Sequence, residues 1–155
     1  MHTLILGIGN TLLADEGIGV HVIEYLQTRH DPLPDTTLVD GGTLSFTLAG
    51  AIESADNLIV VDAAQLHAQP GTVKTFIDED MESFLHTNNK RSVHEVGLLD
   101  LMTIARLSDH YPTRRALIGI QPQKLDWGEH PTEEVQAAIP AACDQVRELL
   151  ETWHS

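Results

Sequence analysis

Three side chains that could bind a metal ion come from distant parts of the sequence: Glu16, Asp62 and His94. Each follows or closes a short apolar run with the pattern of a buried strand or of the loop that leaves it. In an open α/β sheet, ligands bind outside the carboxyl ends of the strands, so residues far apart in sequence can meet there. Two carboxylates and one imidazole suit a divalent transition metal. The sequence therefore predicts metal chemistry in a cleft.

Each of these residues also has an ordinary structural explanation. Asp15 and Glu16 open a predicted helix, where negative charge interacts favourably with the helix dipole. An acid after a parallel strand, such as Asp62, often caps the next helix, and His94 can cap or pack against its own helix. The hypothesis of a shared site rests on the convergence of all three at one edge of a sheet.

Short apolar runs alternate with helical patterns along the chain, which favours an α/β fold with a mostly parallel sheet covered by helices on both sides. Strands are expected at 4–9, 37–40, 58–62, 72–77 and 116–120, with 72–77 at an edge because its polarity is mixed. Helices are expected from 16 to about 30 and at 45–54, 96–107 and 132–153, with an interruption of the last one at Pro140. Without repeats or linkers, residues 1–155 are expected to form a single domain.

Composition narrows the classes of partner and location. The chain has 155 residues, 42% of them hydrophobic, which suits a globular protein. Nine basic residues against 23 acidic ones give a net charge of −14, which argues against nucleic acid and against an anionic membrane surface. The sequence shows neither a signal-peptide pattern nor an apolar run of the ~20 residues that span a bilayer. A cytoplasmic protein without membrane insertion is therefore expected.

No side chain is recognisable as a nucleophile. Cys143, the single cysteine, excludes an intramolecular disulfide and lies on the apolar stripe of the last predicted helix, which indicates an inert core residue. The Gly-x-Ser-x-Gly elbow of serine hydrolases is absent. His94 and Glu95 are not followed by the second histidine of the helical zinc-protease motif.

A second hypothesis starts from the turn Gly7–Gly9. The dinucleotide-binding fingerprint needs a third glycine, and Leu12 occupies that position. Asp40, after the second predicted strand, could act as the ribose-binding acid. A nucleotide-binding α/β protein thus stays an alternative, although a turn that requires glycine torsions explains the same residues.

Taken together, four motifs resemble a known family. Residues 6–19, LGIGNTLLADEGIG, strongly resemble the start of the nickel–iron hydrogenase maturation proteases. The motifs DGGT at 40–43, LIVVDA at 58–63 and HEVG at 94–97 follow in the family's order and at its spacing. The resemblance covers nearly the whole chain; the first motif is highly specific, whereas the other three would be weak alone.

The resemblance implies a three-layer α/β/α sandwich with a twisted five-stranded sheet. It implies an endopeptidase that removes the C-terminal extension of the hydrogenase large-subunit precursor after nickel insertion. The family's metal contacts fall on Glu16, Asp62 and His94, and its substrate cleft includes Asp40, Gly41, Gly42 and Thr43. Nickel is the expected metal, owned by the protease or supplied by the substrate. A non-catalytic chaperone that checks the metal on the same fold remains an alternative.

Overall fold

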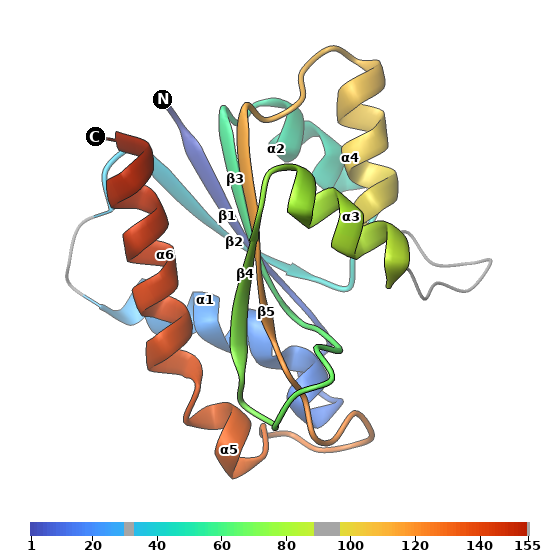
Figure 1. The fold of residues 1–155 in the computed structure, drawn as a ribbon, viewed down its shortest axis with the longest axis vertical. Coiled ribbons are helices and arrows are strands. Elements are labelled where there is room, and N and C mark those ends of the chain that lie inside the picture. Colours follow the sequence, from blue (N-terminus) through green and yellow to red (C-terminus); the bar gives the residue numbers. More distant parts are fainter. Residues whose placement is uncertain (30–32, 89–96, 155) are drawn as a thin grey trace.

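A five-stranded sheet forms the centre of the computed structural model, which describes residues 1–29, 33–88 and 97–154 (Figure 1). The strands lie in the order β2-β1-β3-β5-β4. Four are parallel: β1 (Thr3–Ile8), β2 (Thr36–Gly42), β3 (Asn57–Ala63) and β5 (Arg114–Ile120). The fifth, β4 (Val73–Ile77), is antiparallel to β5 at one edge. The expectation of a mostly parallel sheet of five strands is confirmed.

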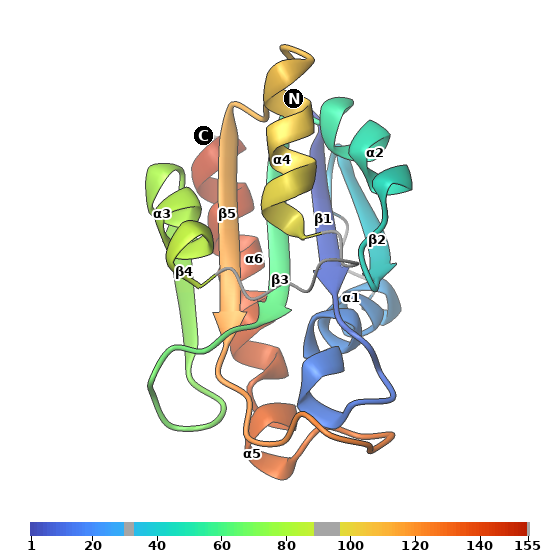
Figure 2. The same ribbon diagram turned by 90° about the vertical axis from the view of Figure 1, so that its right-hand side faces the viewer.

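Helices cover both faces of the sheet and complete the three layers (Figure 2). One face carries α1 (Ile18–Thr28) and α6 (Ile139–His154). The other carries α2 (Ala49–Glu53), α3 (Glu79–Thr87) and α4 (Leu98–Leu107). Short elements complete the described chain: the 3-10 turns η1 (Ala14–Gly17) and η2 (Phe46–Leu48), and α5 (Glu133–Gln136). Within the described residues, no helix has the length and apolar character to cross a bilayer.

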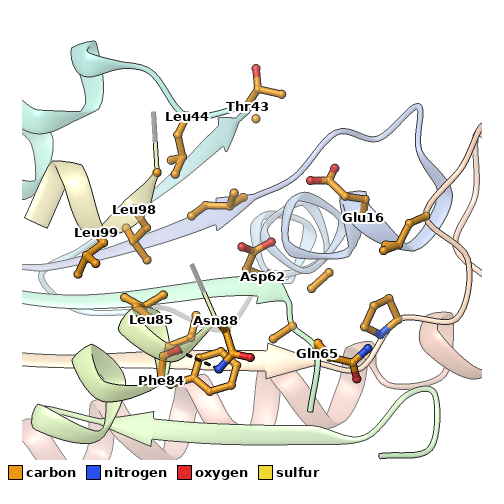
Figure 3. Close-up of a pocket in the computed structure, with 18 of the residues that line it drawn as sticks. Glu16, Thr43, Leu44, Asp62, Gln65, Phe84, Leu85, Asn88, Leu98 and Leu99 are labelled. Atoms are coloured by element: carbon orange, nitrogen blue, oxygen red, sulfur yellow. Dashed lines mark hydrogen bonds between the residues drawn. The ribbon is translucent and has the colours of Figure 1, made fainter. Parts of the chain in front are cut away.

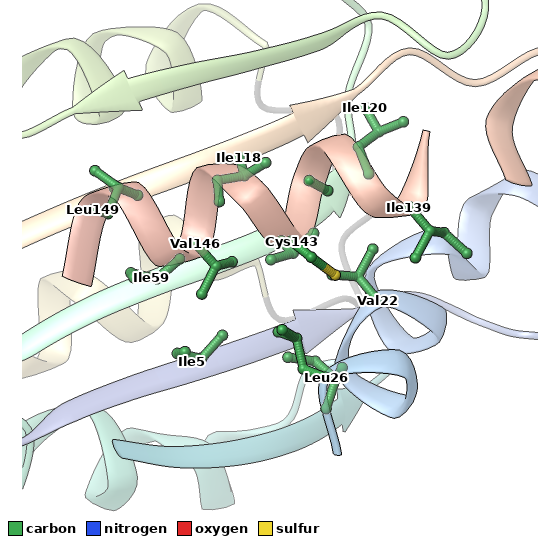
Figure 4. Close-up of a cluster of buried hydrophobic side chains, with 14 of the residues drawn as sticks. Ile5, Val22, Leu26, Ile59, Ile118, Ile120, Ile139, Cys143, Val146 and Leu149 are labelled. Atoms are coloured by element: carbon green, nitrogen blue, oxygen red, sulfur yellow. The ribbon is translucent and has the colours of Figure 1, made fainter. Parts of the chain in front are cut away.

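The core is divided in two because strand side chains alternate between the faces of the sheet. Ile5, Ile59 and Ile118 are fully buried against the α1 and α6 layer (Figure 4). Their neighbours Leu6 and Val60 are buried on the opposite face, in the cluster that includes α2, α3 and α4. Strands buried on both faces explain the continuous apolar runs of the sequence.

Two helical segments differ from expectation. Helix α3 was not predicted, although Met81, Phe84 and Leu85 have the i, i+3, i+4 spacing of one helix face. The last predicted helix is indeed broken, and the break lies before Pro140, which becomes the second residue of α6. Proline is tolerated in the first turn of a helix because its missing N–H has no intrahelical partner there.

The strand order reverses between β1 and β3. From β1 the chain passes through α1 on one face to β2, and it returns to β3 through α2 on the opposite face. β1 and β3 pair only as far as Gly7 and Val61, so the carboxyl ends of the two strands separate beyond these residues. Such a switch point is where open α/β sheets bind ligands.

Cys143 lies on the buried, apolar face of α6, where its thiol is unreactive. It is 2% exposed among Val22, Ile139 and Val146 (Figure 4), and burial raises the pKa of its thiol to about 11 despite the nearby Arg29 and Arg147. The thiol is therefore protonated at neutral pH, as an unreactive core side chain would be.

We expect Cys143→Ser to keep the processing activity that the family resemblance implies, while the free energy of unfolding falls by about 1–3 kcal/mol, because a hydroxyl replaces the thiol in an apolar site. Urea unfolding and a tail-removal assay measure the two effects. Cys143→Ala, which adds no hydroxyl, is the matched control. A folded Cys143→Ser protein without activity would contradict the assignment of Cys143 to the core.

Candidate functional site

A pocket of about 730 Å³ opens at the carboxyl ends of β1 and β3. Glu16 and Asp62 both line it, so the structure brings together two of the three residues that the sequence predicted to share a site. Figure 3 shows their carboxylates facing the same open space, with Thr43 and Leu44 across from them. The topological switch point is thus also the position of the clustered acids.

Glu16 is positioned by the turn that joins β1 to α1. It lies in η1, and the backbone N–H of Asn10 donates a hydrogen bond to its carboxylate. The turn sits directly against the strand ends: a Cβ on Gly9 would lie 2.0 Å from the Glu16 carbonyl oxygen, and one on Gly19 would lie 2.1 Å from that of Val61. Gly9 also has φ +140°, which side chains disfavour. Gly9 and Gly19 therefore allow the turn and the strand ends to pack against each other, where any side chain would clash.

Asp62 lies near the end of β3. Because strand side chains alternate, it projects from the same face as Leu58 and Val60, toward the α3 and α4 layer. Burial raises the pKa of Asp62 well above its usual range, and the negative charge of Glu16 raises it further. Two like charges in a partly desolvated pocket repel each other, and a cation placed between them would relieve that repulsion.

The Asp40–Thr43 motif contributes backbone rather than an acid to the pocket. Gly42 and Thr43 line the pocket, whereas Asp40 is exposed and its Oδ1 accepts a hydrogen bond of 2.9 Å from the N–H of Gly42. Gly42 has φ +48° and its carbonyl accepts the N–H of Gly9 at 2.9 Å. Asp40 thereby stabilises the turn that directs Thr43 and Leu44 along one wall of the pocket. Gly41 packs on Leu6 below.

The opposite side of the pocket is apolar, and the sequence analysis did not identify it. Phe84 and Leu85 come from α3, and Leu98 and Leu99 come from the first turn of α4 (Figure 3). The helical spacing of Met81, Phe84 and Leu85 was the signal that could have revealed α3. Acidic groups at one end and hydrocarbon at the other suit a substrate with both a charged and an apolar part.

His94, the third predicted ligand, lies outside the described residues. Residues 88 and 97, which flank that gap, both line the pocket. Among residues 1–29, 33–88 and 97–154, no three His, Cys, Asp or Glu side chains are grouped as metal ligands. The described part of the site is therefore a pair of carboxylates, Glu16 and Asp62.

Asp15 has a role that the sequence did not suggest. It is fully buried, and its carboxylate accepts hydrogen bonds from the N–H groups of Gln123, Lys124 and Thr132 and from the Thr132 hydroxyl, at 2.6–2.9 Å. Burial alone would raise the pKa of Asp15, but these hydrogen bonds hold it below its usual value. Asp15 thus anchors the loop after β5 to the turn that carries Glu16.

We expect Asp15→Asn to lower the free energy of unfolding by about 2 kcal/mol at neutral pH, since an amide cannot accept all four donors and leaves buried N–H groups unpaired. Processing should fall about tenfold or more, because Glu16 lies on the loosened turn. Urea unfolding and the tail-removal assay measure both. Asp126→Asn is the matched control for stability, as Asp126 lies in the same loop with a side chain 80% exposed. Equal stability of the two variants would contradict the anchoring role.

Comparison with known proteins gives a consistent result. The family described as hydrogenase maturation protease matches residues 20–149. The hydrogenase expression/formation protein HupD of Rhizobium leguminosarum bv. viciae is 38% identical over 151 residues, which cover 97% of this chain and 74% of HupD. The hydrogenase 2 maturation protease of Escherichia coli K12 is 37% identical over 152 residues, 97% of this chain and 91% of that protein.

Solved structures share the fold over almost the whole length. The hydrogenase maturating endopeptidase HybD from E. coli superposes with a TM-score of 0.89 at 35% identity, over 98% of this chain and 93% of HybD. The [NiFe] hydrogenase maturation protease HybD from Thermococcus kodakarensis superposes with a TM-score of 0.76 at 26% identity, over 97% and 99% of the two chains. The sheet and the helices that cover it therefore belong to a fold that is already known.

Proposed function

Since this chain belongs to the hydrogenase maturation protease family, we propose that it removes the C-terminal extension of a nickel–iron hydrogenase large-subunit precursor after nickel insertion. Its coarser function, that of an endopeptidase in hydrogenase maturation, follows from the family. The observation that carries the finer proposal is the pocket that combines Glu16 and Asp62 with an open apolar wall.

In this proposal Glu16, Asp62 and His94 contact the nickel that the precursor already carries. The donor set fits a divalent transition metal, because such ions accept carboxylate and imidazole ligands. Burial first, and then the charge of Glu16, raise the pKa of Asp62, and a cation bound between the two carboxylates would offset both effects. Such a metal polarises a peptide carbonyl or lowers the pKa of a bound water. The described pocket residues include no cysteine, and the hydroxyls of Thr43 and Ser45 have no histidine or lysine among that described lining to activate them, which is consistent with that chemistry.

The remaining pocket groups would hold the extension. Thr43, Leu44 and Ser45 lie outside helix and strand along one wall of the pocket, and their backbone could pair with an extended peptide as a strand edge does. Phe84, Leu85, Leu98 and Leu99 would receive apolar side chains and exclude water from the reacting bond. The acids then meet the metal-bearing end of the substrate, while the hydrocarbon wall orients the tail.

The direct experiment is to combine the purified chain with the nickel-loaded precursor and to measure the mass of the large subunit. Loss of the C-terminal extension is the expected result. A precursor that is bound but keeps its full mass would favour the metal-checking chaperone instead. A specific thermal shift with NAD or ATP would favour the nucleotide-binding alternative.

A further inference from the structure

Exposed apolar side chains lie at the pocket and on the loops that adjoin it. Of the eight large hydrophobic residues that the described chain exposes, two line the pocket and two lie on the bridged loops that follow β1 and β5. They are Leu12, Phe46, Leu125 and Trp127, with exposed fractions of 54, 62, 54 and 75%, and we call them the apolar rim. Phe46 and Leu125 line the pocket itself, so the rim is continuous with the site.

The two segments that carry most of the apolar rim are bonded to each other. Leu13 and Gly128 form a parallel bridge; the N–H of Gly128 donates to the Leu12 carbonyl at 3.0 Å, and the N–H of Ala14 donates to the Gly128 carbonyl at 2.8 Å. Leu12 and Trp127 each precede one bridged residue and so occupy neighbouring positions. Figures 1 and 2 show the loop after β5 beside the loop after β1, at the same end of the sheet.

The loop after β5, which carries Leu125 and Trp127 of the apolar rim, is held by buried hydrogen bonds although these two side chains are exposed. The carboxylate of Asp15 fixes Gln123, Lys124 and Thr132, which bracket Leu125 and Trp127. Binding through a loop that is already ordered costs less conformational entropy than binding through a mobile one. An exposed apolar cluster on a fixed support is typical of a protein interaction site, and tryptophan is the residue most enriched at binding hot spots.

We propose that the apolar rim docks the folded body of the hydrogenase large-subunit precursor while the C-terminal extension enters the pocket. This inference rests on the proposed function. Its partner is favoured by continuity: a protein whose tail fills the pocket must place its adjacent surface over Phe46 and Leu125. Stable complexes bury about 800 Å² on each partner, which requires contact outside the pocket.

The negative charge of this chain predicts a second property of the docking face on the precursor. Asp126 and Glu129 are exposed on either side of Trp127 in the sequence. The ammonium of Lys124 lies 3.8 Å from a carboxylate oxygen of Asp126, but the whole chain carries a net charge of −14. An acidic surface would be repelled, so the docking face of the precursor should have an apolar centre flanked by Lys or Arg side chains. Association should accordingly weaken as the salt concentration rises.

The test is Trp127→Ala, measured against the purified nickel-loaded precursor by binding and by initial rates of tail removal. We expect the dissociation constant and KM to rise about tenfold or more, with kcat within about twofold, because the acids of the pocket are untouched. The matched control is Leu107→Ala, which removes a side chain 83% exposed at the end of α4 remote from Leu98. Thermal unfolding should be unchanged in both variants, since both side chains are exposed.

Each outcome decides the proposal. Unchanged binding and KM in Trp127→Ala overturn the docking role but leave the proposed proteolysis intact. Binding that Trp127→Ala weakens, without any cleavage by the parent chain, supports docking and overturns the proteolysis. A parent chain that does not bind the precursor overturns docking. If the parent chain forms a dimer that Trp127→Ala dissolves, with precursor binding unaltered, the occupant of the apolar rim is a second copy.

Discussion

Asp62→Asn is expected to abolish removal of the C-terminal extension while the protein remains folded. The amide keeps the volume of the side chain but removes the negative charge that would face the metal of the substrate. Loss of a group that merely supports a metal ligand costs 10–100-fold in affinity or activity, so loss of a direct contact should cost at least about a hundredfold. The same result is expected for Glu16→Gln and His94→Ala.

The free energy of unfolding of Asp62→Asn shows whether activity is lost because the site has changed or because the protein is misfolded. Burial and the charge of Glu16 raise the pKa of Asp62, so its ionised form is disfavoured in the folded protein. Removing that charge should leave the free energy of unfolding within about 1 kcal/mol of the parent value or increase it. Circular dichroism and urea unfolding measure this. Glu24→Gln is the control, because Glu24 is an acid on α1 with a side chain 58% exposed. Full activity in all three site variants would refute the assignment of the metal contacts.

The second large effect concerns the state of the substrate. We expect the protease to cut the nickel-loaded precursor and to spare the same precursor prepared without nickel. Two carboxylates and one imidazole leave coordination positions open, which groups of the substrate can fill. A peptide copied from the C-terminal extension should also survive, because it lacks both the metal that would contact Glu16 and Asp62 and the folded body that would dock on the apolar rim.

Mass spectrometry of the tail after incubation with each of the three substrates distinguishes the models. The nickel-free precursor reloaded with nickel before incubation is the control, and its cleavage should be restored. Efficient cutting of the isolated peptide would demonstrate a self-sufficient peptidase and would contradict recognition of the substrate's metal. Equal cutting of the loaded and nickel-free precursors would show that the protease does not distinguish the two states.

The local sequence was sufficient to predict the secondary-structure elements that carry or precede Glu16 and Asp62. The run Leu58–Val61 is apolar at every position because β3 is buried on both faces, and Asp62 follows where the strand reaches the pocket. Glu16 was likewise expected at the start of a helix after the first strand. The class of fold, the position of Asp62 at the end of a strand and the position of Glu16 in the turn before a helix could be read from such patterns, because apolar periodicity reports burial directly.

Only the tertiary structure decided how these parts form a site. The reversal of strand order between β1 and β3 brings Glu16 and Asp62 to one pocket, and α3 with α4 supplies its apolar wall. Asp15 bonds to groups 108 to 117 residues away, and these bonds fix the loop that presents Trp127. Contacts at such separations have no period and no local motif, because they depend on which strands become neighbours. The sequence thus determined which residues could do chemistry, and the packing of the sheet determined which of them meet.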